Sequence, residues 1–324
     1  MAQYLTSPLN FALTETSFFG IASLGSARCL LDHGRKVLDL VQCYGGVSSS
    51  ALAAAVLLTS PDKIQEYLEG LYQLVDEISP LQYGAVTPGY DLIASVRAVL
   101  SNVLADDAHE NASGKLYVKV TELRLVDKYT HVTVHHVDQG SSSCKQTKGP
   151  RYFEVGDKCW QLGNEIEISV FQSKEELIEV LLGAIYVPWF PSWHLPRFRD
   201  KFIGDATLSR RESFPVATSF SFPNGHLVKL SPGPRSHVTM RDKLAVGWID
   251  TSGQRFDISS LQLFRVGDGL FPPPKDFLQT YLAEGYEDAI RFLKFYHAYE
   301  DNDKGLYKPR QREYAIIHGI NDLK

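Results

Sequence analysis

A serine between small residues is the part of this sequence whose residue types and spacing best suit covalent chemistry. It is Ser48, within the run Gly46-Val47-Ser48-Ser49-Ser50. In a nucleophile elbow, a sharp turn between a strand and a helix exposes a serine hydroxyl, and the helix N-terminus stabilises an anion beside it. The pattern here is G-x-S-x-S, so a serine replaces the second glycine of G-x-S-x-G. The run predicts Ser48 as a nucleophile and the Ser49 N–H as an oxyanion donor.

The flanking segments have the composition that such an elbow requires. Residues Val37–Tyr44 are mostly apolar, which favours a buried strand, and Ala51–Leu58 is rich in strong helix formers. Small residues between a strand and a helix are also common in α/β proteins without catalysis. The motif alone therefore leaves both interpretations open.

Periodicity and capping residues predict the elements that would position this serine. Ile64–Ile78 carries an apolar helical stripe after Ser60-Pro61-Asp62, and Asp91 precedes a second helix. Ser173-Lys174-Glu175-Glu176 is a capping box before a third helix, and residues 116–120 alternate as in a half-buried strand. Strands alternating with helices predict an α/β fold with a largely parallel sheet. Such sheets place their sites at the carboxyl ends of the strands.

Composition excludes several classes of function. The 324 residues are 44% apolar and carry 33 Lys and Arg against 38 Asp and Glu, a net charge of −5 that gives no electrostatic case for binding nucleic acid. Four scattered cysteines without a C-x-x-C pair favour a reducing compartment over a disulfide framework or a zinc site. The N-terminus lacks a secretory pattern, and no apolar run approaches the roughly 20 residues that span a bilayer. We expect a cytoplasmic protein without a transmembrane helix, and a peripheral location on lipid droplets or membranes stays open.

Two segments stand apart from the predicted domain of residues 1–300. The polar run from Asp138 to Pro150 interrupts short β-type runs, which predicts a β-rich insertion near residues 126–165. Residues 301–324 are charged and lack periodicity, so they are predicted to form a tail.

Longer stretches of the chain resemble the patatin-like phospholipase domain family. The resemblance runs from about residue 9 to residue 295, broken near 126–165. It implies a three-layer α/β/α sandwich with a mostly parallel central sheet and a Ser–Asp dyad that hydrolyses or transfers fatty acyl esters. For the family these are triacylglycerols, phospholipids and, among its nearest members, retinyl esters; no cofactor is implied. The stretches that carry it are Leu9-Asn10-Phe11-Ala12, Phe18 to Leu30, Tyr83 to Asp91, Phe171 to Pro188, Leu270 to Lys275 and Glu284 to Asp288.

The resemblance implies Ser48 as the nucleophile and Asp205 as the base. The family's dyad motif is Asp-Gly-Gly or Asp-Gly-Ala, whereas this chain has Gly204-Asp205-Ala206-Thr207. A shift of one residue in the alignment would place Gly204 at the base position and remove the dyad. Asp205 could equally be a solvated turn residue.

The oxyanion loop of the family is rich in glycine, so that backbone N–H groups can approach the substrate carbonyl. The corresponding segment here runs from Leu13 to Gly20, includes Glu15, and ends in its one glycine. Gly20 is the predicted donor together with Ser49. Loss of one oxyanion donor typically costs about 2.7–4 kcal/mol of transition-state stabilisation. We therefore expect weak activity.

Three aromatic side chains near the predicted site could contact the substrate. Trp189, Phe190 and Trp193 would line an acyl-chain pocket or form a lipid-docking loop, or else pack as a rigid loop on the core. His131, His135 and His136 with Asp138 are better explained by an exposed strand face than by a metal site, and no metal is predicted.

Two functions from different classes follow from these patterns. The first is a lipid acyl-ester hydrolase or transacylase that uses Ser48 and Asp205, with a neutral lipid or phospholipid as its substrate. The second is an inactive patatin-like fold that binds lipid or a lipase partner. They differ in one geometric condition, because an enzyme needs the Ser48 hydroxyl and an Asp205 oxygen within hydrogen-bond reach. The sequence identifies no protein partner.

Overall fold

The computed structural model describes residues 8–13, 20–126, 151–155, 158–188, 190–209, 220–231, 256–259 and 272–301. Nine strands in these ranges form one sheet in the order β4-β5-β3-β2-β1-β8-β9, with β7 also on β3 and β6 on β7. The five strands β3, β2, β1, β8 and β9 are parallel, and the pairs on the other side of the sheet are antiparallel. The strands are β1 (Leu9–Leu13), β2 (Val41–Val47), β3 (Leu116–Val126), β4 (Arg151–Val155), β5 (Lys158–Ile168), β6 (Arg197–Phe198), β7 (Lys201–Asp205), β8 (His226–Ser231) and β9 (Phe256–Ser259).

Strands β2 and β7 share one edge of β3. Strand β2 pairs with β3 as far as Val47 opposite Lys119, and β7 takes over with Asp205 opposite Val120. Strand β5 pairs with the same residues of β3 on its other edge. Because β2 and β7 approach each other along this edge, their carboxyl ends meet.

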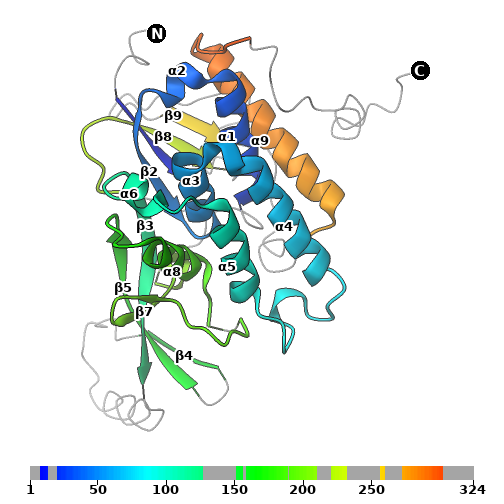
Figure 1. The fold of residues 1–324 in the computed structure, drawn as a ribbon, viewed down its shortest axis with the longest axis vertical. Coiled ribbons are helices and arrows are strands. Elements are labelled where there is room, and N and C mark those ends of the chain that lie inside the picture. Colours follow the sequence, from blue (N-terminus) through cyan, green and yellow to red (C-terminus); the bar gives the residue numbers. More distant parts are fainter. Residues whose placement is uncertain are drawn as a thin grey trace, which may run out of the picture.

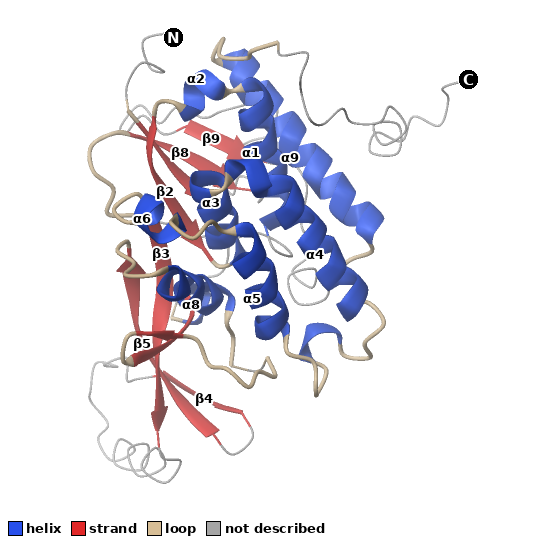
Figure 2. Cartoon of the chain, viewed as in Figure 1, coloured by secondary structure: helices blue, strands red, loops and turns tan. Residues whose placement is uncertain are grey.

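The helices pack together beside the sheet (Figures 1 and 2). Helix α3 lies against the face of β2 that carries Gly46, whereas the rings of Phe220 and Phe222 cover the opposite face at Gly45. The described helices are α1 (Ile21–His33), α2 (Arg35–Leu38), α3 (Ser49–Thr59), α4 (Ile64–Ile78), α5 (Leu92–Val103), α6 (Ala108–Ala112), α8 (Lys174–Ile185) and α9 (Lys275–Phe295).

Helices α1 and α9 approach each other unusually closely. A Cβ atom on Gly25 would lie 2.0 Å from the Leu282 carbonyl oxygen, and one on Gly285 would lie 1.9 Å from the Ala22 oxygen. The Ser26 hydroxyl donates a hydrogen bond of 2.8 Å to the Gly285 carbonyl. Glycine at both positions lets the backbones touch, so α9 from the end of the chain is fixed on α1 from its beginning.

Most elements expected from the sequence are confirmed. The apolar stripe of α4 is buried, with its start marked by a 3₁₀ turn at Pro61–Lys63. The Asp91 carboxylate caps α5 by accepting from the Ala94 N–H, and Ser173 caps α8 by accepting from the Glu176 N–H. The mixed α/β architecture with a parallel central sheet confirms the predicted fold class.

One expected boundary is wrong. Residues 37 and 38 belong to the short helix α2 rather than to a strand, and the strand continues to Val47. Apolar character alone did not separate a helical turn from a strand here. Gly45 and Gly46 both lie within the strand, and neighbouring groups closely cover one face of it at each of them.

Two predicted regions are only partly described. Strands β4 and β5 give residues 151–155 and 158–168 antiparallel pairing beside β3, while 127–150 and 156–157 lie outside the described residues. The tail from residue 302 also lies outside them. The domain limits therefore stay predictions. Among the helices that the structure describes, none is long and apolar enough to cross a membrane.

Candidate active site

Ser48 occupies a strained turn between β2 and α3. Its backbone has φ 55° and ψ −141°, although it is not a glycine. Such conformations cost of order 1–3 kcal/mol and are concentrated at functional sites. A Cβ atom on Gly46 would lie 2.2 Å from the Ala51 Cα, so the turn requires glycine there, whereas Ser50 is fully buried in the first turn of α3. The first glycine of G-x-S-x-G is thus required at Gly46. Ser50 replaces the second glycine without disrupting the turn.

Asp205 accepts a hydrogen bond from this serine. The Ser48 Oγ donates to Asp205 Oδ2 over 2.6 Å. The second carboxylate oxygen, Oδ1, accepts from the Thr207 N–H at 2.9 Å, and the Asp205 N–H donates to the Tyr186 carbonyl at 2.7 Å. The carboxylate is only 5% exposed, while Ser48 remains partly exposed. A buried acceptor fixed from two sides is therefore held against the hydroxyl of a residue that is partly exposed.

The geometric condition set by the sequence is therefore met by Asp205 and not by Gly204. Successive residues of a strand face opposite sides of the sheet. Gly204 pairs with Thr121, whereas Asp205 pairs with Val120 and points to the face that carries Ser48. Asp205 is also not a solvated turn residue, because it ends β7 and is buried.

Only part of the predicted oxyanion site is described. Ser49 is the first residue of α3, so its N–H lies at the helix N-terminus directly after Ser48. Gly20 has φ 69° and precedes α1, a backbone conformation that favours glycine. Residues 14–19, including Glu15, lie outside the described residues.

Two of the three aromatic residues predicted to contact the substrate are described, and they differ in exposure. Phe190 is 8% exposed and belongs to the core, whereas Trp193 is 93% exposed. Trp189 lies outside the described residues. Phe190 and Trp193 therefore do not line one shared pocket.

Burial raises the pKa of one phenol beside Asp205 and of two thiols elsewhere in the described part of the chain. Burial, reinforced by the charge of Asp91, raises the pKa of Tyr186 to about 12, so this phenol stays neutral at physiological pH. Burial also raises the pKa of the Cys43 thiol and that of the Cys29 thiol. Within the described ranges, no group of His, Cys, Asp and Glu side chains could hold a metal ion; His131, His135, His136 and Asp138 lie outside those ranges.

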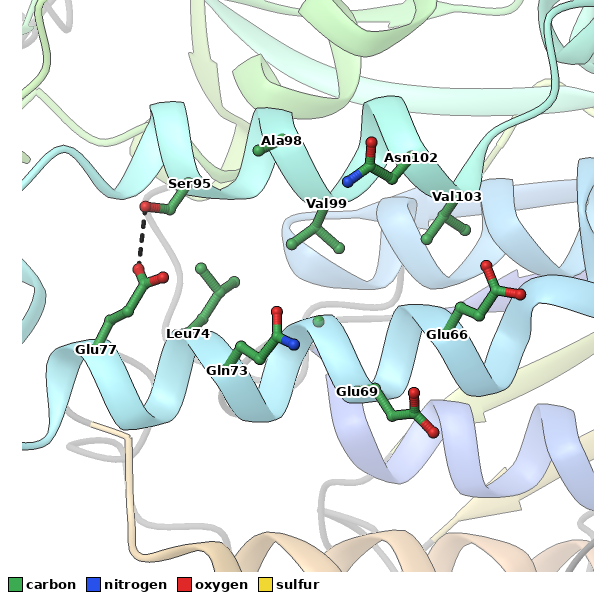
Figure 3. Close-up of a pocket in the computed structure, with 11 residues that line it drawn as sticks. Glu66, Glu69, Gln73, Leu74, Glu77, Ser95, Ala98, Val99, Asn102 and Val103 are labelled. Carbon is green, nitrogen blue, oxygen red and sulfur yellow. Dashed lines mark hydrogen bonds between the residues drawn. The ribbon is translucent and has the colours of Figure 1, made fainter.

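A groove of about 360 Å³ lies elsewhere, between α4 and α5 (Figure 3). Neither Ser48 nor Asp205 lines it, and Glu66, Glu69 and Glu77 give it an acidic wall. The Ser95 hydroxyl donates to Glu77 across it at 3.2 Å. An acidic groove on the helical side is unsuited to an acyl chain, so we do not assign it to the candidate active site.

Sequence reasoning missed the role of Thr207. Its departure from the family's glycine suggested a degraded motif, yet its backbone N–H holds the Asp205 carboxylate in place. The sequence did contain a signal for this contact. An aspartate two residues before the residue whose N–H donates is the pattern of an Asx turn.

The fold and the site geometry define a mixed α/β protein with a serine and an aspartate paired where two strands end, and comparison with known proteins confirms the resemblance to the patatin-like phospholipase domain family. Curated homologues are patatin-like phospholipase domain-containing proteins. The chain is 28% identical to human Patatin-like phospholipase domain-containing protein 4 over 287 residues, which cover 88% of this chain and 96% of that protein. It is 24% identical to human Omega-hydroxyceramide transacylase and 22% identical to human Patatin-like phospholipase domain-containing protein 2, covering 96% and 97% of this chain.

The matched lengths differ between these relatives. The chain spans 51% of the transacylase and 57% of the second phospholipase domain-containing protein, so about half of each relative has no counterpart in it. No family model matches the chain. VipD from Legionella pneumophila covers 89% of the chain at a TM-score of 0.36 and 11% identity, a likeness too low to support an argument.

Proposed function

We propose that this protein is a serine acyl-ester hydrolase or transacylase of lipid metabolism, with Ser48 as nucleophile and Asp205 as general base. The hydrogen bond of 2.6 Å between the two side chains carries the proposal. The strained backbone of Ser48 supports it, because strain at a partly exposed hydroxyl is hard to explain by packing. The named relatives support the lipid class, since they include phospholipase domain-containing proteins and a ceramide transacylase.

The proposed reaction follows from the direction of the hydrogen bond. The Ser48 Oγ attacks the ester carbonyl carbon while its proton passes to Asp205 Oδ2. The tetrahedral intermediate then expels the alcohol, which takes the proton, and Ser48 is left acylated. Water completes hydrolysis, whereas an acceptor hydroxyl completes transacylation. The Ser49 N–H and Gly20 N–H would stabilise the oxyanion.

The proposed substrates are acyl esters of lipids, namely triacylglycerols, retinyl esters or phospholipids. We expect turnover to be weak, because the segment from Leu13 to Gly20 has few glycines to bring N–H groups to the oxyanion. We also propose that the protein works in the cytoplasm, at the surface of lipid droplets or membranes.

The first experiment is labelling of the purified protein with a fluorophosphonate probe, which reports an activated serine without a choice of lipid. We expect wild type to be labelled and Ser48→Ala to lose all labelling, because the probe needs the nucleophilic oxygen. Ser95→Ala serves as the matched control, since it removes a serine hydroxyl on α5 outside the proposed site.

Absence of labelling in folded wild type would contradict the enzymatic proposal. Equal labelling of wild type and Ser48→Ala would contradict the choice of serine. The first of these outcomes would favour the alternative function, an inactive fold that binds lipid or a lipase partner.

A further inference from the structure

Asp205 is the last residue of β7, a short strand whose outer edge is only partly covered by another strand. The inner edge of β7 pairs with β3 from Phe202 to Asp205. On the outer edge, β6 pairs with Lys201 and Phe202 only, within the part of the chain that the structure describes. Backbone opens most easily at the ends of elements. The position of the Asp205 carboxylate therefore depends on what holds the outer edge of β7 beyond Phe202.

Two backbone carbonyl groups hold that edge in place of a strand. The Ile203 N–H donates to the Pro196 carbonyl at 3.1 Å. The Asp205 N–H donates to the Tyr186 carbonyl at 2.7 Å. Both carbonyls belong to the α8–β6 connection (residues 186–188 and 190–196), one at each of its ends. The connection thus supplies the acceptors that buried N–H groups need, and its conformation fixes the end of β7.

The connection approaches β7 most closely at Gly204. A Cβ atom on Gly204 would lie 3.0 Å from the Tyr186 carbonyl oxygen and 2.8 Å from Leu123 Cδ1. An added methyl group would therefore press on the same carbonyl that accepts from the Asp205 N–H. This close contact ties the position of Asp205 to that of the connection.

Glu179 on α8 holds the end of the connection that lies beside β7. Its Oε2 accepts from the Arg197 N–H at 3.0 Å, and Arg197 directly follows Pro196 in the chain. Its Oε1 accepts from His194 Nε2 at 2.8 Å and pairs with the Arg97 guanidinium of α5. Both carboxylate oxygens are thus used, and the side chain is only 18% exposed. One carboxylate therefore joins α8, α5 and the start of β6.

A second carboxylate holds the middle of the connection. Asp91, whose Oδ1 caps α5, accepts through Oδ2 from the Trp193 N–H at 3.0 Å and from the Ser192 hydroxyl at 3.2 Å. Helix α8, which carries Glu179, packs against both α5 and β7 (Figure 1). Asp91 binds in the middle of the connection, whereas Glu179 binds at the residue next to the Pro196 carbonyl. Of the two carboxylates, Glu179 therefore has the shorter path to β7.

We propose that Glu179 is a positioning residue that holds the Asp205 carboxylate against the Ser48 hydroxyl. It acts through the end of the α8–β6 connection and the outer edge of β7. Its effect on turnover rests on the proposed function, because turnover responds only if Asp205 is the base. A misplacement of about 1 Å can cost about 100-fold in rate, so the link should be visible in kcat. The positioning itself needs no catalysis and can be measured in the backbone.

The first test compares variants of Glu179 in the hydrolysis of p-nitrophenyl butyrate and in the rate of fluorophosphonate labelling. We expect Glu179→Ala to lower kcat about 30-fold with KM changed less than twofold, because the base is displaced and the ester is not. Glu179→Gln keeps an oxygen that can accept from the Arg197 N–H, so it should stay within about threefold of wild type. Glu179→Asp keeps the charge but is one methylene shorter, and it should lose about tenfold.

A double-mutant cycle separates positioning from a general loss of structure. In the Asp205→Asn background, Glu179→Ala should slow labelling less than twofold, because no base is left to displace. Glu300→Ala is the matched control and should stay within twofold of wild type. The Glu300 side chain is 21% exposed, and it accepts from the Lys36 N–H at 3.2 Å and pairs with Lys36 Nζ at 3.6 Å, on α2.

Amide hydrogen exchange tests the same link without any activity. Peptides that cover residues 201–209 should exchange at least tenfold faster in Glu179→Ala than in wild type, because the N–H groups of Ile203 and Asp205 lose fixed acceptors. Peptides from α4 should be unchanged. Glu300→Ala should leave residues 201–209 as protected as they are in wild type. If Glu179→Ala fails to fold, Glu179→Asp takes its place in both tests.

Two results would overturn the proposal whether or not the protein is an enzyme. They are unchanged exchange of residues 201–209 in Glu179→Ala, and an equal increase in Glu300→Ala. In an active protein, a loss in Glu179→Gln as large as that in Glu179→Ala would also overturn it, as would an undiminished effect of Glu179→Ala in the Asp205→Asn background. Faster exchange in Glu179→Ala, together with a wild type that is never labelled, would contradict the proposed function and support the positioning.

Discussion

Replacement of Asp205 by asparagine is expected to lower kcat/KM for a short soluble ester by about 10³-fold. General-base catalysis typically contributes about 10²–10⁴-fold. The asparagine oxygen can still accept from the Thr207 N–H, so the side chain should stay in place. Its amide nitrogen, however, accepts no proton from Ser48. The measurement is steady-state hydrolysis of p-nitrophenyl butyrate, accompanied by the rate of fluorophosphonate labelling.

Asp32→Asn is the matched control for this prediction. Asp32 is a buried carboxylate that accepts from a hydroxyl, that of Tyr286 at 3.1 Å, but it lies between α1 and α9. We expect this variant to keep wild-type turnover in its folded fraction. Asp205→Asn with more than a tenth of wild-type turnover would show that Asp205 is not the base.

Gly285→Ala is expected to lower the free energy of unfolding by about 3 kcal/mol or more. The added methyl group would lie 1.9 Å from the Ala22 carbonyl oxygen, and backbone cannot move aside as a side chain can. Overpacking of a close contact typically costs about 1–3 kcal/mol and occasionally more. It should outweigh the gain of about 1 kcal/mol from replacing glycine in a helix. Urea unfolding at equilibrium measures the difference.

Gly70→Ala provides the comparison for this variant, because it makes the same exchange within α4. There the new Cβ would lie 2.7 Å from a methyl group of Val99, a side chain that can change its rotamer. We expect a change of at most about 1 kcal/mol in either direction. If Gly285→Ala and Gly70→Ala had the same free energy of unfolding, the backbones of α1 and α9 would not be in the close contact described.

The elements set by local sequence were predictable, and those set by distant contacts were not. The stripe of α4 and the caps of α5 and α8 follow from residues within one or two turns, so periodicity and spacing identify them. The one-turn helix α2 has too few residues to show a period. Exposure of Trp193 and burial of Phe190 depend on contacts with Asp91 and the core, which no local pattern records.

The candidate site also combines a feature set by local sequence with one set by distant contacts. The elbow around Ser48 is local, and its small residues indicate it directly. The choice between Gly204 and Asp205 could not be made from the sequence, because it depends on the register of β7 on β3. A slip of one residue turns every side chain of a strand to the other face. The pairing of Asp205 with Val120 removes that ambiguity.

The meeting of two strand ends on β3 also determines when the site can form. Ser48 and Asp205 are 157 residues apart in the chain. At roughly 5–20 residues per second, a ribosome would need about 8–30 s to make the second residue after the first. During that interval the nascent chain contains the hydroxyl without its acceptor, and β7 cannot yet extend the edge of β3. Assembly of the pair therefore requires synthesis of all the residues between them, which separates synthesis of Ser48 from formation of its hydrogen bond with Asp205.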